Sequence, residues 1–432
     1  MVVPNVVGKA GKFNLCFQET ILSNHAGVVL LKEFTDRLGL ELLINAHLEV
    51  KERERGYTEA ESVLALCWSQ ILGGEHLSDL DVLRGDAGTR ALLGLESVIA
   101  PTTAGEFLRK FTIGDLTSLR TLLSTAAERM RPVQMGEVVT LDFDGAIYEQ
   151  CSKCKQGSRK AYNGKIGYAP IFCFWAEQSE LLMSHLLAGN RHPSAKVLWF
   201  FDQTLRAVPA GRSLKVRADS AFYTWDFILR LEREGATYAI TADLTQQRRE
   251  QLAAIAEKDW KSYGHGTKAE VAEFWYAPDR QAPHRYIAKR ERRTTKKGEQ
   301  YWHYHVVITN DQRSTARQVM RWSLKRCTME NLIKEHKSGF GLEKMPTNNY
   351  HANWAWLLIG QLAFNIVAWF KRHVLPERYH TATIKTIRHH LLNVAGKIVS
   401  SGKQFFLMLS DQSLFQDVWT FALNRLADFK SG

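Results

Sequence analysis

The chain contains 432 residues, 45% of them hydrophobic and 24% charged, which is the balance of a globular protein with a large core and two to three domains. Its 57 Lys and Arg against 45 Asp and Glu give a net charge of +12, which favours a polyanionic partner over a generic basic enzyme. Six cysteines in so long a chain exclude a disulfide framework and fit a reducing cytosol.

The first part of the chain, residues 1–135, predicts an all-helical domain. It shows no strong alternation of polar and apolar residues, and apolar side chains recur at helical spacing, as at Val29 and Phe34. A further helix is capped by the segment that begins at Pro101. No signal peptide is visible, because the first residues lack a charged region followed by a long apolar core.

Two motifs end a predicted strand on an aspartate. The run Val-Val-Thr-Leu-Asp-Phe-Asp, which starts at Val138, predicts a β-strand whose period of two places Asp142 and Asp144 on one face near its carboxyl end. A second short strand ends on Asp219, and a helix follows over residues 224–234. Carboxylates at strand ends in an α/β sheet lie where such folds bind ligands, although each aspartate alone could be a turn or helix-cap residue.

A third acidic site lies in the stretch Arg-Cys-Thr-Met-Glu-Asn-Leu-Ile-Lys-Glu-His-Lys, which ends at Lys337. At 3.6 residues per turn, Arg326, Glu330 and Lys334 fall on one helix face with Lys337, so that cations bracket one carboxylate. A metal-binding carboxylate beside phosphate-binding cations is what phosphoryl transfer needs. The alternative is a solvated helix with ordinary ion pairs. Glu335 is the competitor for Glu330, but it points away from this face.

Together these three sites resemble the DDE transposases of bacterial insertion sequences, the group with a Y-x2-R-x3-E-x6-K signature. Arg326, Glu330 and Lys337 fit its spacing. Further matching pieces are residues 141–144, 189–192, 217–223 and 334–342. The tyrosine position is occupied by Ser323, with Trp322 beside it. Because this position holds a larger side chain in similar proteins, we expect Ser323→Tyr to be tolerated.

The resemblance implies an α/β, RNase H-like catalytic core, and the predicted elements suit that fold. A meander of strands is followed by alternating helices and strands, in the order strand 166–176, strand 181–187, helix 194–207, the Asp219 strand, helix 224–234 and strand 237–242. The interval between Asp219 and Glu330 is longer than such a core needs. It contains further predicted strands at 270–275, 284–290 and 301–309, which indicate a β-rich insertion at about 260–310.

The predicted organisation is a helical N-terminal DNA-binding domain at 1–135, an RNase H-like DDE catalytic domain at 136–375 and a helical C-terminal region at 376–432. The resemblance implies that the first domain grips the transposon end. The apolar run at 354–370 is interrupted by Gln361 and Asn365, so it predicts a buried helix and not a membrane span.

The resemblance also implies the chemistry. Asp144, Asp219 and Glu330 would be the catalytic acids and would hold two Mg²⁺ ions, for which Mn²⁺ can substitute, with Asp142 as the alternative first acid. Water bound to Mg²⁺ would cut DNA to leave a 3′-OH, which would attack the target at the same metal pair. Such a site needs no Ser or Cys nucleophile, and no Gly-rich loop for ATP is visible.

The expected DNA contacts are cations and aromatic residues. The densest basic run is predicted to form the tip of a hairpin between two inserted strands, with a merely solvated tip as the alternative. The aromatic residues beside it could stack on an extruded base or pack as core. The candidate DNA-binding residues are Arg326, Lys337, Lys334, Lys289, Arg290, Arg292, Arg293, Trp302 and Tyr223.

The resulting hypothesis is a cut-and-paste transposase that binds the terminal inverted repeats of an insertion sequence, cuts the DNA and joins the 3′-OH end to target DNA. It would act as a homodimer on double-stranded DNA, in the bacterial cytoplasm at the nucleoid, without ATP or a membrane. The alternatives are a metal-dependent RNase H-like nuclease without strand transfer and a catalytically silent DNA-binding inhibitor. Cys151 and Cys154 lack a second Cys/His pair, so a four-coordinate zinc site is not predicted.

Overall fold

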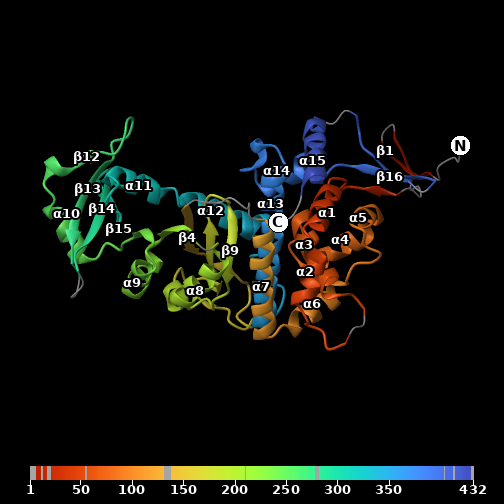
Figure 1. Cartoon of the computed structure of the whole chain (residues 1–432), viewed down its shortest axis with the longest axis horizontal. Helices are drawn as coiled ribbons and strands as arrows, with labels where there is room; N and C mark the ends of the chain where they lie inside the picture. Colours follow the sequence, from red (N-terminus) through yellow and green to blue (C-terminus); the bar gives the residue numbers. More distant parts are fainter. Residues whose placement is uncertain are drawn as a thin grey trace.

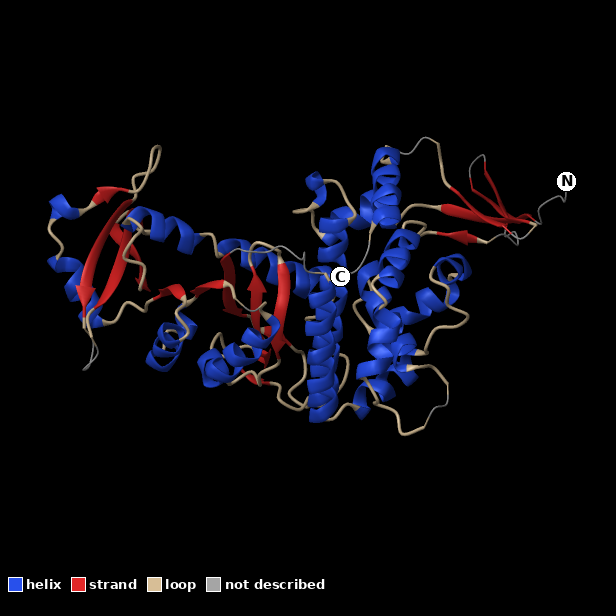
Figure 2. Ribbon diagram, viewed as in Figure 1, coloured by secondary structure: helices blue, strands red, loops and turns tan. Residues whose placement is uncertain are grey.

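The computed structural model describes residues 6–10, 13–16, 21–53, 56–130, 138–209, 211–277, 282–402, 404–411 and 414–429. The molecule is elongated, with a β-rich unit at one end, a central sheet, and a helical region at the other end (Figures 1 and 2). The long helix α13 (Tyr350–His373) stands between the central sheet and the helical region.

The N-terminal region is largely helical, as predicted. Its helices are α1 (Val28–Arg37), α2 (Leu40–His47), α3 (Glu59–Leu72), α4 (Leu80–Gly85), α5 (Ala87–Leu92), α6 (Pro101–Lys110) and α7 (Ile113–Arg129). Thr58 and Thr112 begin α3 and α7 with reciprocal capping boxes, which satisfy backbone N–H groups that the first turn leaves free. The expectation of an all-helical domain is wrong at its start, where the strands are β1 (Val6–Ala10), β2 (Phe13–Cys16) and β3 (Leu22–Ser23).

The core of the central sheet has five strands in the order β9-β8-β4-β10-β11. Their bounds are β4 (Val138–Gly145), β8 (Ile171–Trp175), β9 (Glu180–His185), β10 (Ser213–Ala218) and β11 (Thr237–Thr241). β4, β10 and β11 run parallel, whereas β8 and β9 pair antiparallel. On one face, Phe143 packs against Phe200 of α8 (Val197–Ala207) and Phe227 of α9 (Trp225–Arg233). On the other face, Phe174 packs against Phe364 of α13.

The β-rich insertion continues this same sheet. β15 pairs antiparallel with β11, with Thr309 opposite Ala239, and the full order is β12-β13-β14-β15-β11-β10-β4-β8-β9. The inserted strands are β12 (Lys261–Ser262), β13 (Glu270–Tyr276), β14 (His284–Thr294) and β15 (Gln300–Thr309). The helices α10 (Gln246–Ala254) and α11 (Ala316–Leu324) flank them. The insertion therefore extends the central sheet through backbone hydrogen bonds.

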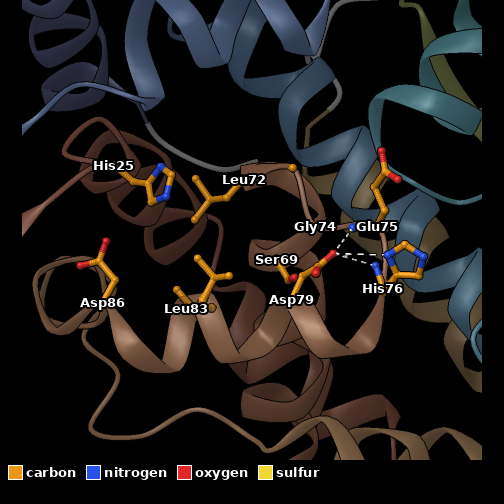
Figure 3. A pocket seen from close by; sticks show the side chains of 11 residues that line it. His25, Ser69, Leu72, Gly74, Glu75, His76, Asp79, Leu83 and Asp86 are labelled. Carbon is orange, nitrogen blue, oxygen red and sulfur yellow. Dashed lines mark hydrogen bonds and ion pairs between the residues drawn. The ribbon is translucent and has the colours of Figure 1, made fainter.

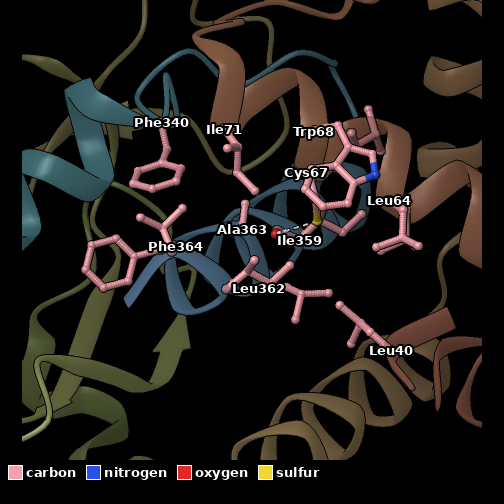
Figure 4. Packing of buried hydrophobic residues seen from close by; sticks show 14 of the residues in the cluster. Leu40, Leu64, Cys67, Trp68, Ile71, Phe340, Ile359, Leu362, Ala363 and Phe364 are labelled. Atoms are coloured by element: carbon pink, nitrogen blue, oxygen red, sulfur yellow. Dashed lines mark hydrogen bonds between the residues drawn. The ribbon is translucent and has the colours of Figure 1, made fainter. Parts of the chain in front are cut away.

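Helix α13 is the buried helix that the apolar run predicts. It is the one helix among the described residues that is long and apolar enough to cross a membrane, and its apolar stretch is buried inside the fold. Figure 4 shows Ile359 and Leu362 beside Cys67 and Trp68 of α3. The two polar interruptions are explained by β9, because the side-chain amides of Gln361 and Asn365 both donate to the Leu181 carbonyl.

The C-terminal region is not wholly helical, so that prediction is wrong in its middle. Short turns around α14 (Ile384–Ile387) lead to the hairpin of β16 (Gly396–Ser401) and β17 (Gln404–Met408), and α15 (Gln416–Asp428) follows. Two causes act together. The residues of the hairpin are rich in β-branched and aromatic types, and β16 gains a partner in β3, with Gly396 opposite Ser23.

Candidate active site

Asp144 and Asp219 lie side by side at the carboxyl ends of two neighbouring parallel strands. The register of β4 and β10 pairs Phe143 with Ala218, and the next residue along each strand is one of the two acids. Asp219 also caps the turn that follows, because its carboxylate accepts the Ala221 N–H at 3.1 Å. The alternation of β4 and the end of β10 thus bring together two acids that lie far apart in the sequence.

Arg326 connects these acids to the third one. It lies directly before helix α12 (Cys327–Lys334), and its guanidinium forms an ion pair with Asp144 and a longer contact of 3.5 Å with Glu330 Oε1. A cation therefore lies among the carboxylates of Asp144 and Glu330, and its charge also favours the ionised form of Asp219. This cluster is the convergence of residue types that phosphoryl transfer requires.

The electrostatics of the two strand-end acids are unusual. Burial, together with the negative charge of Asp144, raises the pKa of Asp219 from 3.8 to about 7, although Arg326 opposes the shift. Burial also raises the pKa of Asp144, again against Arg326. Two adjacent carboxylates that resist losing both protons form a site that a divalent cation would stabilise.

The donor chemistry fits Mg²⁺ or Mn²⁺, since Asp144, Asp219 and Glu330 offer hard oxygen ligands. In the geometry described, however, no three His, Cys, Asp or Glu side chains among the described residues are grouped closely enough to hold a metal ion. The reason is that the Glu330 side chain is 59% exposed, with Arg326 between it and Asp144. Metal binding by all three acids thus requires Arg326 or Glu330 to change rotamer.

Asp142, the alternative first acid, is engaged elsewhere. Its two carboxylate oxygens accept hydrogen bonds from Arg217 at 2.6 and 2.7 Å, and both side chains are almost fully buried. Arg217 also donates to the Trp322 carbonyl at 2.9 Å, which holds the end of α11 against the sheet. The geometry therefore favours Asp144 over Asp142 as the first acid.

The departure from the signature at Ser323 has a structural cause. Ser323 is 6% exposed, and Trp322 lies 5.7 Å from the Arg217 guanidinium and not among the acids. A phenol ring added at so buried a position would overpack the fold, so the expectation that Ser323→Tyr is tolerated does not fit the burial of this residue.

The helical period expected for the signature changes after Lys334, because a π-turn (Glu335–Gly339) follows α12. Lys337 donates to the Ile147 carbonyl at 3.3 Å and pairs with Glu343. Glu335, the competitor for Glu330, is partly buried, and its carboxylate accepts the Ile384 N–H at 2.6 Å. Lys334 is exposed.

The basic run lies mostly along β14 and not at the hairpin tip, which is formed by residues 295–299. Arg290 differs most from expectation, because it is 4% exposed and paired with Glu257 and Glu270. Its guanidinium is therefore unavailable to phosphate. Lys289 is partly buried beside Tyr263, whereas Arg292 and Arg293 are exposed.

Trp302 lies between two guanidinium groups. Its ring centre is 4.2 Å from Arg290 and 4.4 Å from Arg292. Because cations flank the ring, stacking of a base on Trp302 would require Arg292 to move. The ring instead packs against Arg290 and Arg292 close to the tip of the hairpin, where Trp302 pairs with Arg292.

Tyr223 borders a pocket of about 730 Å³ that also reaches Asp219. Its hydroxyl hydrogen-bonds with that of Tyr286 at 2.8 Å, and Arg248 lies over its ring. Sequence reasoning did not assign several polar residues of this pocket, although the motif at 189–192 was a signal for them. They are Lys160, Tyr162, Asn190, Arg191 and His192.

Two other features, a pocket in the helical region and the pair Cys151 and Cys154, include none of the three candidate acids. Figure 3 shows a pocket of about 390 Å³ in the helical region, where Asp79 accepts the backbone N–H groups of Glu75 and His76 and so shapes a turn. None of the three candidate acids lines it. Cys151 and Cys154 are free and exposed, and they belong to no metal-binding group among the described residues.

Comparisons with known proteins assign the family. Among solved structures, the chain is similar to the cryo-EM structure of a piggyBac transposase synaptic complex with hairpin DNA, at 11% identity and a TM-score of 0.46, covering 86% of this chain and 80% of that chain. No curated protein matches the chain. The family described as "Transposase DDE domain group 1" matches residues 7–431. Because this match spans nearly the whole sequence, the chain belongs to the DDE transposase family of group 1.

Proposed function

We propose that this transposase cuts and joins DNA at Asp144, Asp219 and Glu330, which hold divalent metal ions during the reaction. The observation that carries the proposal is the approach of Asp144 and Asp219 at adjacent strand ends, with Arg326 linking Asp144 to Glu330. The strand order β9-β8-β4-β10-β11, with the first three strands antiparallel, supports an RNase H-like core.

The protein's own groups have separable tasks in this reaction. Two metal ions, when bound, lower the pKa of a bound water and stabilise the departing 3′-oxygen. Asp144 is buried at the end of β4, whereas Asp219 is partly buried and faces the pocket of about 730 Å³. Glu330, on the exposed side, closes the ligand set once its contact with Arg326 is released. Arg326 then offers its guanidinium to a phosphate, for which its planar fork is suited.

The DNA would lie across the cations on this side of the molecule. The exposed Lys334 and the partly buried Arg326 on the α12 side are joined by the exposed Arg292 and Arg293 on β14, and the net charge of +12 favours a polyanion. We further propose that the helical N-terminal region grips the inverted repeats of an insertion sequence. Joining two ends to one target in a cut-and-paste reaction calls for two copies of the chain, hence a homodimer on DNA.

The test is cleavage of a labelled duplex taken from the DNA that flanks the gene. Asp219→Asn and Glu330→Gln should abolish cleavage in Mg²⁺ or Mn²⁺ while binding of the duplex persists, because binding rests on basic groups. Glu299→Gln at the hairpin tip is the matched control and should cleave normally. Normal cleavage by Glu330→Gln would refute the assignment of the third acid. Cleaved but never joined products from the wild type would favour a nuclease instead.

A further inference from the structure

The acids can be approached from two sides. One side carries α12, with Arg326 and Lys334. The other is the pocket of about 730 Å³ that follows the carboxyl ends of β4, β10 and β11, and its described lining includes Asp219 but no residue of α12. Asp219 therefore belongs both to the acid cluster and to the wall of this pocket. A joining reaction needs such an arrangement, because two DNA segments must meet at one set of acids.

The loop that carries the pocket's polar residues is held in place by backbone packing. Gly189 lies so close to the small sheet of β5 (Tyr148–Glu149), β6 (Arg159–Lys160) and β7 (Ile166–Tyr168) that a Cβ there would come within 2.1 Å of the Gly167 carbonyl oxygen. The Gly189 N–H donates to the Gly157 carbonyl at 3.1 Å. This contact fixes residues 190–192 at the rim of the pocket before any ligand binds.

The pocket rim has the chemistry of a nucleic-acid strand site. Lys160 and Arg191 are exposed, and neither forms an ion pair with another residue that the structure describes. Between the β6 and β7 strands, the Tyr162 side chain is 92% exposed although it is aromatic. Unpaired cations bind phosphates, and an exposed tyrosine beside them can stack on a base or enter a groove.

We infer that this pocket, which we call the Tyr162 pocket, receives the target strand, whereas the α12 side holds the transposon end. Lys160 and Arg191 hold target phosphates on either side of the bond that is attacked, and Tyr162 contacts the adjacent base or sugar. The inference rests on the proposed function and adds the location of the second DNA. Its basis is that no residue of α12 belongs to the pocket's described lining, combined with the exposed cations Lys160 and Arg191 at the pocket itself.

The step that this geometry serves is a balanced exchange of esters. The 3′-OH of the transposon end gives its proton to water and forms a new P–O bond with a target phosphate. The target's own P–O3′ bond breaks, and the departing 3′-oxygen takes up a proton from water. One phosphodiester replaces another, so no oxidant, reductant or nucleotide cofactor is consumed.

The experiment separates the two DNA segments. A pre-cleaved transposon end carrying a 3′-OH is incubated with Mg²⁺ and a labelled target duplex, and joined product is measured against target concentration and salt. Lys160→Ala/Arg191→Ala and Tyr162→Ala are compared with Arg206→Ala, an exposed cation on α8 outside the pocket. End binding is measured in parallel by fluorescence anisotropy. All substituted side chains are exposed, so folding is not at issue.

For the double variant, we expect joining at low target concentration to fall about tenfold and to recover as target is added. The log–log salt slope for target should fall by about 1.8, since each phosphate contact contributes about 0.9. Loss of transposon-end binding in the double variant would overturn the inference, because it would place the transposon end in the pocket. Unchanged joining in the double variant would also overturn the inference, because it would show that no DNA binds in the pocket. If the wild type joins nothing, the proposed function itself fails.

Discussion

Asp142 and Arg217 form a buried ion pair on neighbouring strands, two residues before the candidate acid Asp144. The period of a strand places Asp142 and Asp144 on one face, yet only Asp144 reaches Arg326. One strand thus carries a structural carboxylate and a candidate catalytic carboxylate in consecutive positions of the same face.

This pair predicts opposite phenotypes for the two aspartates. Asp142→Ala should lower the free energy of unfolding by about 3–5 kcal/mol, because it leaves the Arg217 charge buried without a partner. Asp144→Asn should stay folded and lose cleavage. Denaturant unfolding monitored by tryptophan fluorescence, together with cleavage per folded molecule, measures both. An unfolding midpoint of Asp142→Ala equal to that of the wild type would show that the pair is dispensable.

The pH dependence of stability follows from Asp219. Its pKa is raised to about 7 in the folded chain, so the folded state binds the proton more tightly than the unfolded state between about pH 4 and pH 7. Stability of the protein in EDTA should therefore decrease as pH rises through this window. Asp219→Asn should remove that part of the decrease. Denaturation midpoints measured from pH 4 to pH 8 in both proteins test the sign, and identical slopes would contradict it.

Ser323→Tyr should destabilise the fold. Adding a phenol ring at a site that is 6% exposed overpacks the junction of α11 with the sheet and should cost about 1–3 kcal/mol. Ser323→Ala, which removes only the hydroxyl, serves as the matched control and should change the unfolding midpoint much less. A tyrosine variant as stable as the wild type and faster in cleavage would restore the view that this position faces DNA.

Strand β14 should contain two arginines that bind DNA, Arg292 and Arg293, and one that stabilises the fold, Arg290. Arg292→Gln/Arg293→Gln should lower the log–log salt slope of DNA binding by about 0.9 for each phosphate that is no longer bound, with no change in stability. Arg290→Gln should instead lower the unfolding midpoint, because Glu257 and Glu270 lose their shared partner. Anisotropy titrations in rising salt and thermal melts separate the two effects. A reduced slope for Arg290→Gln alone, at full stability, would reverse the assignment.

Local sequence patterns were sufficient to predict the strands whose residues alternate regularly or have a typical strand composition. The alternation around Asp144 predicted β4, and the three inserted strands lie where their composition indicated. Long-range partners could not be predicted from local patterns. β16 pairs with its neighbour β17 and also with β3, which lies near the other end of the chain. Arg290 is paired with carboxylates from two other segments. The π-turn after Lys334 inserts a residue that a fixed helical period cannot represent.

The continuity of the sheet fixes the distance between the candidate acids and the basic strand β14. Backbone ladders connect β4 to β14 through β10, β11 and β15, which is four strand spacings of about 4.8 Å, or about 19 Å. The ladder register places Phe143 level with Tyr286 of β14, so Arg292 lies five residues, or about 17 Å, further along the strands than Asp144. A phosphate held by Arg292 would therefore lie about 25 Å from a phosphate at Asp144, which corresponds to about seven base pairs of duplex. Adding or removing one strand of the insertion would move this anchor point along the DNA while leaving the acids where they are.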